Sequence, residues 1–472
     1  MSADPRRWWA LAVLATAQFM VIMDTSIIGV ALPDLQRDLG FGPSGLQWVF
    51  NAYVVAFGGL LLLGGRLSDL LGARRVFAAG WVVLVAGSVV AAAAGGAGIE
   101  IAGRAVQGVG SALIAPSSLT LLMALFSARP KELARAMAFY GAAAPAGGTA
   151  GVFLGGVITE WLSWPWVFII YIPIGLATLA LVPGLLPDVP GRRAGLDVLG
   201  AAAVTGGLAL AVYAIVQAPE RGWGATATVL QLGGAVLLLA LFVAWQRIVR
   251  SPLMPLSVWR TRGLAGANAA MALLGAAWIP MWYFLNLYLQ QVLGYGAFPS
   301  GAALLPMTAL MMVLMVGVTG RLIGRFGTGP LIVTGLLVLA AGLFVLSTID
   351  AGGGFFTDVL PGSLVSAVGM SLVFIPATMA AIGGVAPEQG GLASGIVNTT
   401  YQVGSAIGLA AMTAIATSHG GGELGNLGAL TDGFQAAFVG AAVVALAGSG
   451  LALVTLRARS ARAVPEKETV GA

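Results

Sequence analysis

The chain has 472 residues, of which 58% are hydrophobic and only 9% are charged, and its net charge is +5. Soluble domains carry roughly 25% charged residues, so this composition excludes a soluble protein and predicts a polytopic membrane protein. The absence of cysteine excludes disulfides and thiolate metal sites, and a lone histidine, His419, does not favour a metal site.

Fourteen apolar stretches are long enough to cross a bilayer as helices. They fall at 8–33, 46–64, 76–96, 99–124, 137–159, 165–186, 197–217, 225–248, 264–292, 298–319, 330–349, 358–383, 391–417 and 433–456. We therefore predict an all-α polytopic membrane protein with fourteen transmembrane helices. An even number of spans places both termini on one side of the membrane.

The basic residues indicate which side that is. With the termini in the cytoplasm, only Arg37 and Arg221 fall outside and Arg104 lies within a span, which leaves 20 of the 23 Lys and Arg residues at cytoplasmic ends or loops. The positive-inside rule thus predicts a multi-pass protein of the bacterial cytoplasmic membrane with both termini cytoplasmic. The positive charge follows the topology and does not indicate nucleic-acid binding.

The first span contains an acid, Asp24. It follows Trp8 by 16 residues (24 − 8), or about 24 Å of helix at ~1.5 Å per residue. A charge near the middle of a bilayer costs at least ~2.5 to 3.5 kcal/mol, so the carboxyl needs a partner, a water-filled cavity or a proton. Arg104 of the fourth span is the expected partner, with Asp24 as the only deeply placed acid. The alternatives are a proton-coupling pair and a static ion pair.

An internal repeat divides the chain. Gly65-Arg-Leu-Ser-Asp-Leu-Leu-Gly72 follows the second span, and Gly320-Arg-Leu-Ile-Gly-Arg-Phe-Gly327 follows the tenth, 255 residues later (320 − 65). If this is not a chance similarity, it predicts two pseudo-symmetric six-helix bundles plus two inserted helices. The predicted divisions are 1–190, 191–255, 256–458 and a cytoplasmic tail, 459–472.

Small and polar residues mark two further features. Gly147, Gly151 and Gly155 recur every four residues in the fifth span and form one flat face for helix packing. The second half has no ionisable residue deep in a span; it offers aromatic and amide groups that suit flat or cationic solutes, or that form an interfacial aromatic belt. The candidate substrate-binding residues from both halves are Gln47, Asn51, Tyr53, Trp278, Trp282, Asn286, Tyr288, Asn398, Tyr401 and Gln402.

Several of these segments resemble the major facilitator superfamily, specifically its fourteen-helix drug/proton antiporters. Gly65 to Arg75 is similar to the superfamily's loop motif, and Arg104-Ala-Val-Gln107-Gly108-Val-Gly110 to its buried-arginine motif. The resemblance implies that Asp69, Arg74 and Arg75, with the turn glycines Gly65 and Gly72, form a cytoplasmic conformational lock between the bundles.

Two other segments match the family with departures. The segment Asp24 to Pro33 matches the first-helix motif, with Gly29 where members usually carry Asn. Gly147 to Gly156 is similar to the exporters' antiporter motif, with Val152 where Pro is usual.

The sequence therefore predicts a proton-coupled secondary exporter of amphipathic drugs or metabolites that works by alternating access. It is not an enzyme, and it needs no cofactor beyond a proton gradient. Expected partners are a small amphipathic or cationic solute, protons and the lipid bilayer, and we expect a monomer. A proton-coupled importer would use the same acid, and a non-transporting scaffold or lipid-handling protein is a further alternative.

Overall fold

The structure is a computed structural model that describes residues 6–41, 43–191, 197–250, 252–260, 263–383, 385, 390–423 and 425–456. Most of the chain in these ranges is helical, the rest forms turns and connecting segments, and none of the described residues forms a β-strand. The predicted all-α fold is confirmed. The predicted tail, 459–472, lies outside the described residues.

The helices of the first half and of the inserted segment follow the predicted spans. They are α1 (Arg6–Leu39), α2 (Pro43–Leu71), α3 (Ala73–Ala92), α4 (Ala97–Phe126), α5 (Pro130–Trp161), α6 (Trp166–Ile169), α7 (Tyr171–Leu185), α8 (Val198–Arg221) and α9 (Thr226–Trp245). The sixth predicted span, 165–186, is divided between α6 and α7.

The second half begins with a short 3₁₀ helix, η1 (Leu256–Arg260). Its other elements are α10 (Leu264–Leu287), η2 (Tyr288–Val292), α11 (Ala297–Ala303), α12 (Leu305–Val313), η3 (Leu314–Thr319), α13 (Gly320–Phe326), α14 (Thr328–Leu346), η4 (Phe355–Val359), α15 (Leu360–Ile382), α16 (Gly390–Ser418) and α17 (Leu427–Leu456). Three of them, η2, η3 and η4, are π-helical segments that adjoin α-helices.

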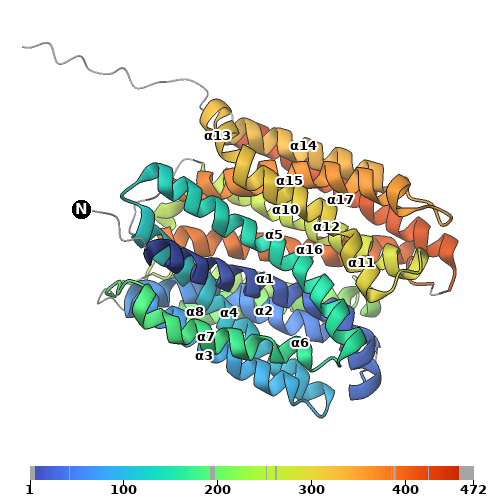
Figure 1. Cartoon of the computed structure of the whole chain (residues 1–472), viewed down its shortest axis with the longest axis horizontal. Coiled ribbons are helices and arrows are strands. Elements are labelled where there is room, and N and C mark those ends of the chain that lie inside the picture. The colour runs from blue at the N-terminus through green and yellow to red at the C-terminus, as the bar shows by residue number, and fades with distance from the viewer. Residues whose placement is uncertain are drawn as a thin grey trace, which may run out of the picture.

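Thirteen helical segments in the described part are long and apolar enough to cross a membrane. The remaining predicted span, 391–417, is also one long helix, α16, whose Asn398, Thr400 and Gln402 make it more polar. The chain is therefore a multi-pass membrane protein. Figure 1 shows its helices running side by side along the long axis of the molecule.

The two halves repeat one packing pattern. In the first, α1 packs on α5, α2 on α4, and α3 on both α4 and α7. In the second, α10 packs on α16, α12 on α15, and α14 on both α15 and α17. Each half has its own apolar core, one built from residues of α1 to α7 and the other mainly from residues beyond 252. This arrangement agrees with the repeat in the sequence, while the domain boundaries themselves stay a prediction.

Close approaches between helices rest on glycine in both halves. On Gly103 and Gly110 of α4, a Cβ would lie 2.8 Å from the backbone of Ala91 and 2.5 Å from that of Leu84. Gly369 of α15 lies against the α14 backbone in the same way. In a bilayer, where water does not drive helices together, such close van der Waals packing is what holds them.

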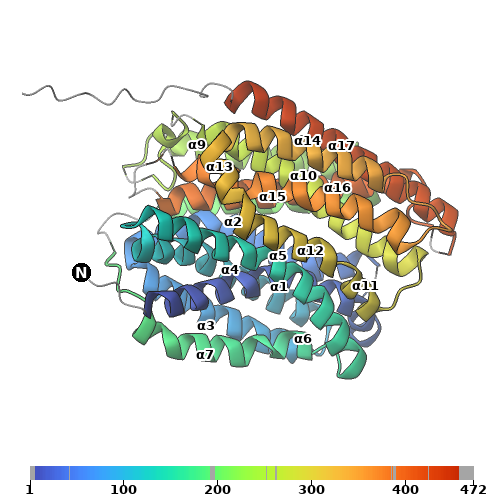
Figure 2. The same cartoon turned by 45° about the horizontal axis from the view of Figure 1, so that its top comes forward.

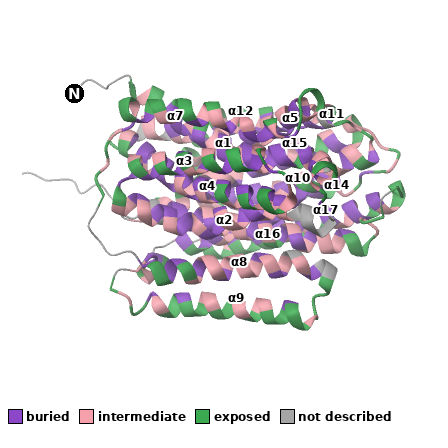
Figure 3. Cartoon of the chain, turned by 90° about the horizontal axis from the view of Figure 1, so that it is seen from below, coloured by how far each residue is buried: buried purple, intermediate pink, exposed green. Residues whose placement is uncertain are grey.

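The hairpin of α8 and α9 lies beside the bundles. α8 contacts α2 and α16, and Figure 3 shows α9 on the outside of α8, with many of its residues exposed. Asp197 caps α8: its carboxylate accepts hydrogen bonds from Gly200 N at 2.8 Å, Trp245 Nε1 at 2.8 Å and Gln246 Nε2 at 2.6 Å. Burial opposes ionisation, but these hydrogen bonds prevail and hold the pKa of Asp197 below its usual value.

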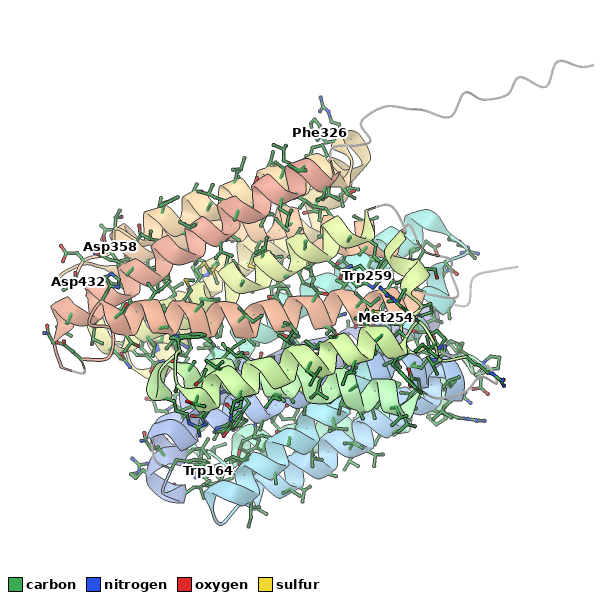
Figure 4. The ribbon with its side chains drawn as sticks, turned by 180° about the vertical axis from the view of Figure 1, so that it is seen from behind. Trp164, Met254, Trp259, Phe326, Asp358 and Asp432 are labelled. Atoms are coloured by element: carbon green, nitrogen blue, oxygen red, sulfur yellow. The ribbon has the colours of Figure 1, made fainter. Side chains whose placement is uncertain are left out.

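Indole groups tie the connecting segments at both ends of the molecule. Figure 4 shows Met254 and Trp259 at the end nearer the N-terminus, where Trp259 Nε1 donates to Met254 Sδ at 3.4 Å. The same figure shows Trp164, Asp358 and Asp432 toward the opposite end. There Trp164 Nε1 donates to Asp38 Oδ2 at 3.0 Å.

The halves meet along two seams. α2 contacts α16, and α5 contacts α11, α12 and η3; α5 and α12 lie side by side in Figure 2. On the second seam Thr149 bonds Thr308, and the rings of Phe153 and Phe298 are 5.0 Å apart. Beside the first seam a cavity of about 10 Å³ is lined by residues of α2, α8 and α16, including Gln402. Drug-sized sites occupy roughly 300–1,000 Å³, so this space admits no such solute.

Candidate functional site

The buried polar site of the first half centres on Arg104 of α4. Its side chain is fully buried, and Nη1 donates to Asp24 Oδ1 of α1 and to Gln107 Oε1 at 2.7 Å. Nε donates to the Val49 carbonyl oxygen at 2.9 Å, and Tyr53 lies 4.7 Å from the guanidinium carbon, measured to its ring centre. The guanidinium thus joins α1, α2 and α4. The structure brings together the predicted pair Asp24 and Arg104.

Further hydrogen bonds orient these groups. Gln107 Nε2 donates to Ser88 Oγ of α3 at 2.8 Å. The Tyr53 hydroxyl donates to the Val21 carbonyl oxygen at 2.9 Å and bonds Ser111 Oγ at 2.8 Å. Tyr53, one of the predicted substrate residues, is fully buried in this conformation and its hydroxyl is used within the first half, so its contact with substrate stays a prediction.

The prediction that Asp24 is the only deeply placed acid concerned depth along the span, and the structure adds a second buried acid near one helix end. Glu100, in the first turn of α4, is fully buried and interacts electrostatically with both Arg104 and Asp24. Sequence reasoning missed it because it stands close to the predicted end of a span. The available signal was its spacing, four residues before Arg104, which places both side chains on one helix face.

The site can exist in two charge states. An ion pair in a dry interior is neutral overall, whereas protonating one partner leaves the other as an uncompensated charge. Such a pair changes its interactions with neighbouring helices when a proton binds, and a transporter needs this property of a coupling site.

The predicted glycine face of α5 lies against α1. Cβ atoms on Gly147, Gly151 and Gly155 would clash with Phe19, with Ser26 and Met23, and with Ile27 respectively. α1, which carries Asp24, is therefore held at backbone distance from α5 around the level of the acid.

The loop motif packs on the segment after α7. Gly72 has φ +93°, and a Cβ there would lie 2.6 Å from the Val189 carbonyl oxygen, so both conformation and space require glycine. Arg74 pairs with Asp188 at 3.3 Å, which joins two segments of the first half. Gly65 is buried, Asp69 half-buried and Arg75 exposed. The ion pair of Arg74 thus lies within one bundle and not between the two.

The predicted substrate residues divide into two groups. Asn51, Trp282, Asn286, Asn398, Tyr401 and Gln402 are half-buried on α2, α10 and α16. Gln402 lies against Gly58 at the seam between the halves, and Tyr401 packs edge-on against Phe374 with ring centres 6.0 Å apart. These positions remain candidates for contact with a solute.

The second group packs in the core of the second half. Trp278 is 7% exposed, and Tyr288 is fully buried with its hydroxyl donating to the Asp350 carbonyl oxygen at 2.6 Å. Both residues are buried in this conformation, and their contact with substrate stays a prediction. The side chain of Gln47 lies outside the described residues.

Comparisons with known proteins agree with this architecture. The family model described as Major Facilitator Superfamily matches residues 14–408 and 318–471. A cephamycin export protein of Amycolatopsis lactamdurans is 39% identical over 442 residues, which cover 93% of this chain and 90% of that protein. A puromycin resistance protein of Streptomyces alboniger is 36% identical, with 97% of this chain and 93% of that protein covered.

A solved structure shares the fold. The human organic anion transporter MFSD10 (TETRAN) superposes with a TM-score of 0.67 at 17% identity, covering 95% of this chain and all of that chain. Three findings lead to one assignment. The helical halves are repeated, the first half holds a buried ion pair, and relatives match along nearly the whole length of the chain. The chain belongs to the major facilitator superfamily and is a membrane transporter, not an enzyme.

Proposed function

We propose that the protein exports amphipathic drugs or metabolites from the cytoplasm in exchange for protons. The observation that carries this proposal is the fully buried Asp24–Arg104 pair, which lies between α1 and α4. The relatives support the direction of transport, since one is a cephamycin export protein and another a puromycin resistance protein.

The mechanism follows from the charge of the pair. With Asp24 ionised, the pair is neutral and α1 is tied to α4. A proton that comes from outside neutralises Asp24, which ends its ion pair with Arg104 and changes the contacts between these helices. Alternating access then moves the bundles about their two seams, and release of the proton to the cytoplasm restores the pair.

The solute would bind between the halves once the seams part. The half-buried residues Asn51 of α2, Gln402 of α16, and Trp282 and Asn286 of α10 are the ones we propose to contact it, with amide groups and an aromatic face. Stacking surfaces with a few amides suit flat, lipophilic or cationic molecules. We further propose that the protein acts as a monomer in the bacterial cytoplasmic membrane, with both termini cytoplasmic and no cofactor other than the proton gradient.

The membrane potential sets the scale of transport. A potential of ~100 mV contributes about 2.3 kcal/mol per elementary charge. Since ~1.4 kcal/mol corresponds to a factor of ten, one proton could sustain roughly a 50-fold gradient of a neutral solute.

The test uses inverted membrane vesicles with an acidified lumen and a lumenal pH-sensitive dye. Adding a substrate outside should release protons from the lumen while the solute accumulates there. Vesicles carrying Asp24→Asn are the control. Solute accumulation without proton movement would contradict the coupling, and proton-driven loss of solute from the lumen would indicate an importer.

A further inference from the structure

Glu100 of α4 is a buried acid whose carboxyl group has no hydrogen-bond partner in the described structure. Its side chain is fully buried, and neither Oε1 nor Oε2 has such a partner among the described residues. An ionised carboxylate in this position would lose its hydration without compensation, which is among the most costly arrangements in a protein interior. Burial without a partner therefore favours a neutral, protonated carboxyl group at this position.

A matching donor lies one helical turn away. Nη2 of Arg104 is also buried and without a hydrogen-bond partner among the described residues, whereas Nη1 bonds Asp24. Side chains four residues apart on a helix lie on one face, so Glu100 can reach Arg104 by rotation of side chains alone. The guanidinium donor and the carboxyl group, both without hydrogen-bond partners among the described residues, thus share one face of α4 while Nη1 of the same guanidinium pairs with Asp24.

The surrounding groups define the charge balance. The titratable groups near Glu100 are Asp24 of α1, Tyr53 of α2 and Tyr171 of α7, and all three are fully buried. α3 contributes no titratable group at this end of the molecule, because its charged residues Arg74 and Arg75 lie at its opposite end. Arg37, Asp34 and Asp38 form ion pairs near the end of α1, and Arg37 is exposed. One buried guanidinium thus faces two buried acids, and this set is neutral when the acids share one proton.

We propose that Glu100 is a second proton-binding site, which shares Arg104 with Asp24 and exchanges one proton with it. Protonated Glu100 and ionised Asp24 become ionised Glu100 and protonated Asp24, while Arg104 stays charged and moves from one carboxylate to the other. One positive and one negative charge are present before and after the step. Loading Asp24 therefore never leaves the guanidinium unpaired.

The position of Glu100 gives this exchange a direction. Glu100 stands in the first turn of α4, about 6 Å closer than Arg104 to the end of the bundle opposite the N-terminus. With the termini in the cytoplasm, this is the outer end, from which the driving protons come. The directional part of the inference rests on the proposed function; the protonation of Glu100 does not.

The first experiment detects the proton without transport. Infrared spectra of the purified full-length protein near neutral pH should contain a carbonyl band from a buried protonated carboxyl. This band should be lost in Glu100→Gln and retained in Glu160→Gln, an exposed acid at the same end of the first half. Asp24→Asn mimics neutral Asp24 and should weaken the band, because Glu100 then ionises to pair with Arg104. If Glu100→Gln does not fold, Glu100→Asp should shift the band. A band unchanged in the Glu100 variant would overturn the inference.

The second experiment measures the exchange. In Glu100→Gln, protonation of Asp24 would leave Arg104 without a carboxylate partner, which makes that protonation less favourable. The pH midpoint of substrate-coupled proton movement should therefore fall by about one unit, which is a tenfold loss of proton affinity. Glu160→Gln should leave the midpoint unchanged. An unshifted midpoint in Glu100→Gln would overturn the exchange with Asp24. If the wild type moves no protons with substrate, the proposed function fails, and the infrared result alone decides whether Glu100 binds a proton.

Discussion

The two halves of the protein share a helix packing but differ in charge at equivalent places. Gly404 and Gly408 of α16 lie against Ala272 and Ala276 of α10, just as Gly147 and Gly151 of α5 lie against Phe19 and Met23 of α1. The residue after Met23 is Asp24, whereas the residue after Ala276 is Ala277, which is fully buried. The second half thus has a small apolar residue in the position of the acid.

The same holds for the arginine. Gly362 and Gly369 of α15 pack on α14 as Gly103 and Gly110 of α4 pack on α3, with identical spacing. Arg104 follows the first glycine of one pair, and Ser363, which bonds the Leu360 carbonyl oxygen at 2.9 Å, follows the first glycine of the other. Of these two equivalent places, the one in the first half carries the buried ion pair. In the proposed function, the duplicated packing is the scaffold that moves, and the charge in one copy is what would make this movement respond to protons.

The largest effect is expected from removing the acid of this charged half. Asp24→Asn should abolish proton-driven efflux, so that a solute gradient of up to roughly 50-fold falls to none. The measurement is uphill transport driven by a pH gradient, with the amount of protein in the membrane as control. Undiminished uphill efflux by this variant would sink the assignment of Asp24.

Removing the cation should cost both coupling and stability. Arg104→Ala leaves Asp24 without its counter-ion, and breaking a buried pair costs about 3–5 kcal/mol. Asp24 then stays protonated, so the transport defect should ease as the external pH is raised. Arg104→Lys should retain part of the function because it keeps the charge but loses the planar fork. A pH profile identical to that of the wild type in Arg104→Ala would favour a static ion pair.

The second half should not tolerate an acid at the equivalent position. Ala277→Asp places a carboxyl in a fully buried site without an arginine and should destabilise the protein by roughly 3 kcal/mol or more. Thermal unfolding in detergent measures the effect. Adding Ser363→Arg should recover part of the loss; if the double variant is no more stable than the single one, the proposed equivalence of the halves is incorrect.

Glycine substitutions test whether the α1–α5 contact of the first half and the α10–α16 contact of the second half are equivalent. Gly151→Leu and Gly408→Leu should each destabilise the protein by about 1–3 kcal/mol or more, because a side chain would meet the facing helix. Gly29→Ala on α1 is the control. Among the described residues, no neighbouring atom lies within 4 Å of the position of the added methyl group, so this substitution should leave the stability unchanged or raise it slightly. Equal tolerance of all three would contradict the packing described.

The smallest effect is expected outside the two halves, at Asp197 of the α8 cap. Asp197→Asn should cost about 1 kcal/mol through the loss of a charged cap. Since hydrogen bonds lower the pKa of this carboxyl in the folded state, its contribution is present above the usual aspartate range and is lost as the pH falls through the lowered pKa. Unfolding curves of wild type and variant should therefore converge at low pH while transport stays intact.

Much of the fold was determined by the sequence alone. Length and hydropathy predicted each of the fourteen spans. In lipid the backbone N–H and C=O groups of a single segment must form hydrogen bonds with each other, and an α-helix is the structure that allows this. The spacing of Gly147, Gly151 and Gly155 predicted a packing face, since residues four apart lie together on a helix. The depth of Asp24 predicted that it needs a partner, and Arg104 was the one arginine that lay within a span and away from its cytoplasmic end.

Which side chains meet was decided only by the tertiary structure. Periodicity could not show that the hydroxyl groups of Tyr53 and Tyr288 donate hydrogen bonds to the carbonyl oxygens of Val21 and Asp350, because those acceptors belong to other helices or loops. Nor could it show that Glu100 is buried, since a residue near a helix end is exposed or covered according to how neighbouring elements are placed. Burial and hydrogen bonding depend on contacts between segments far apart in the chain, and those contacts set the chemistry of an ionisable group.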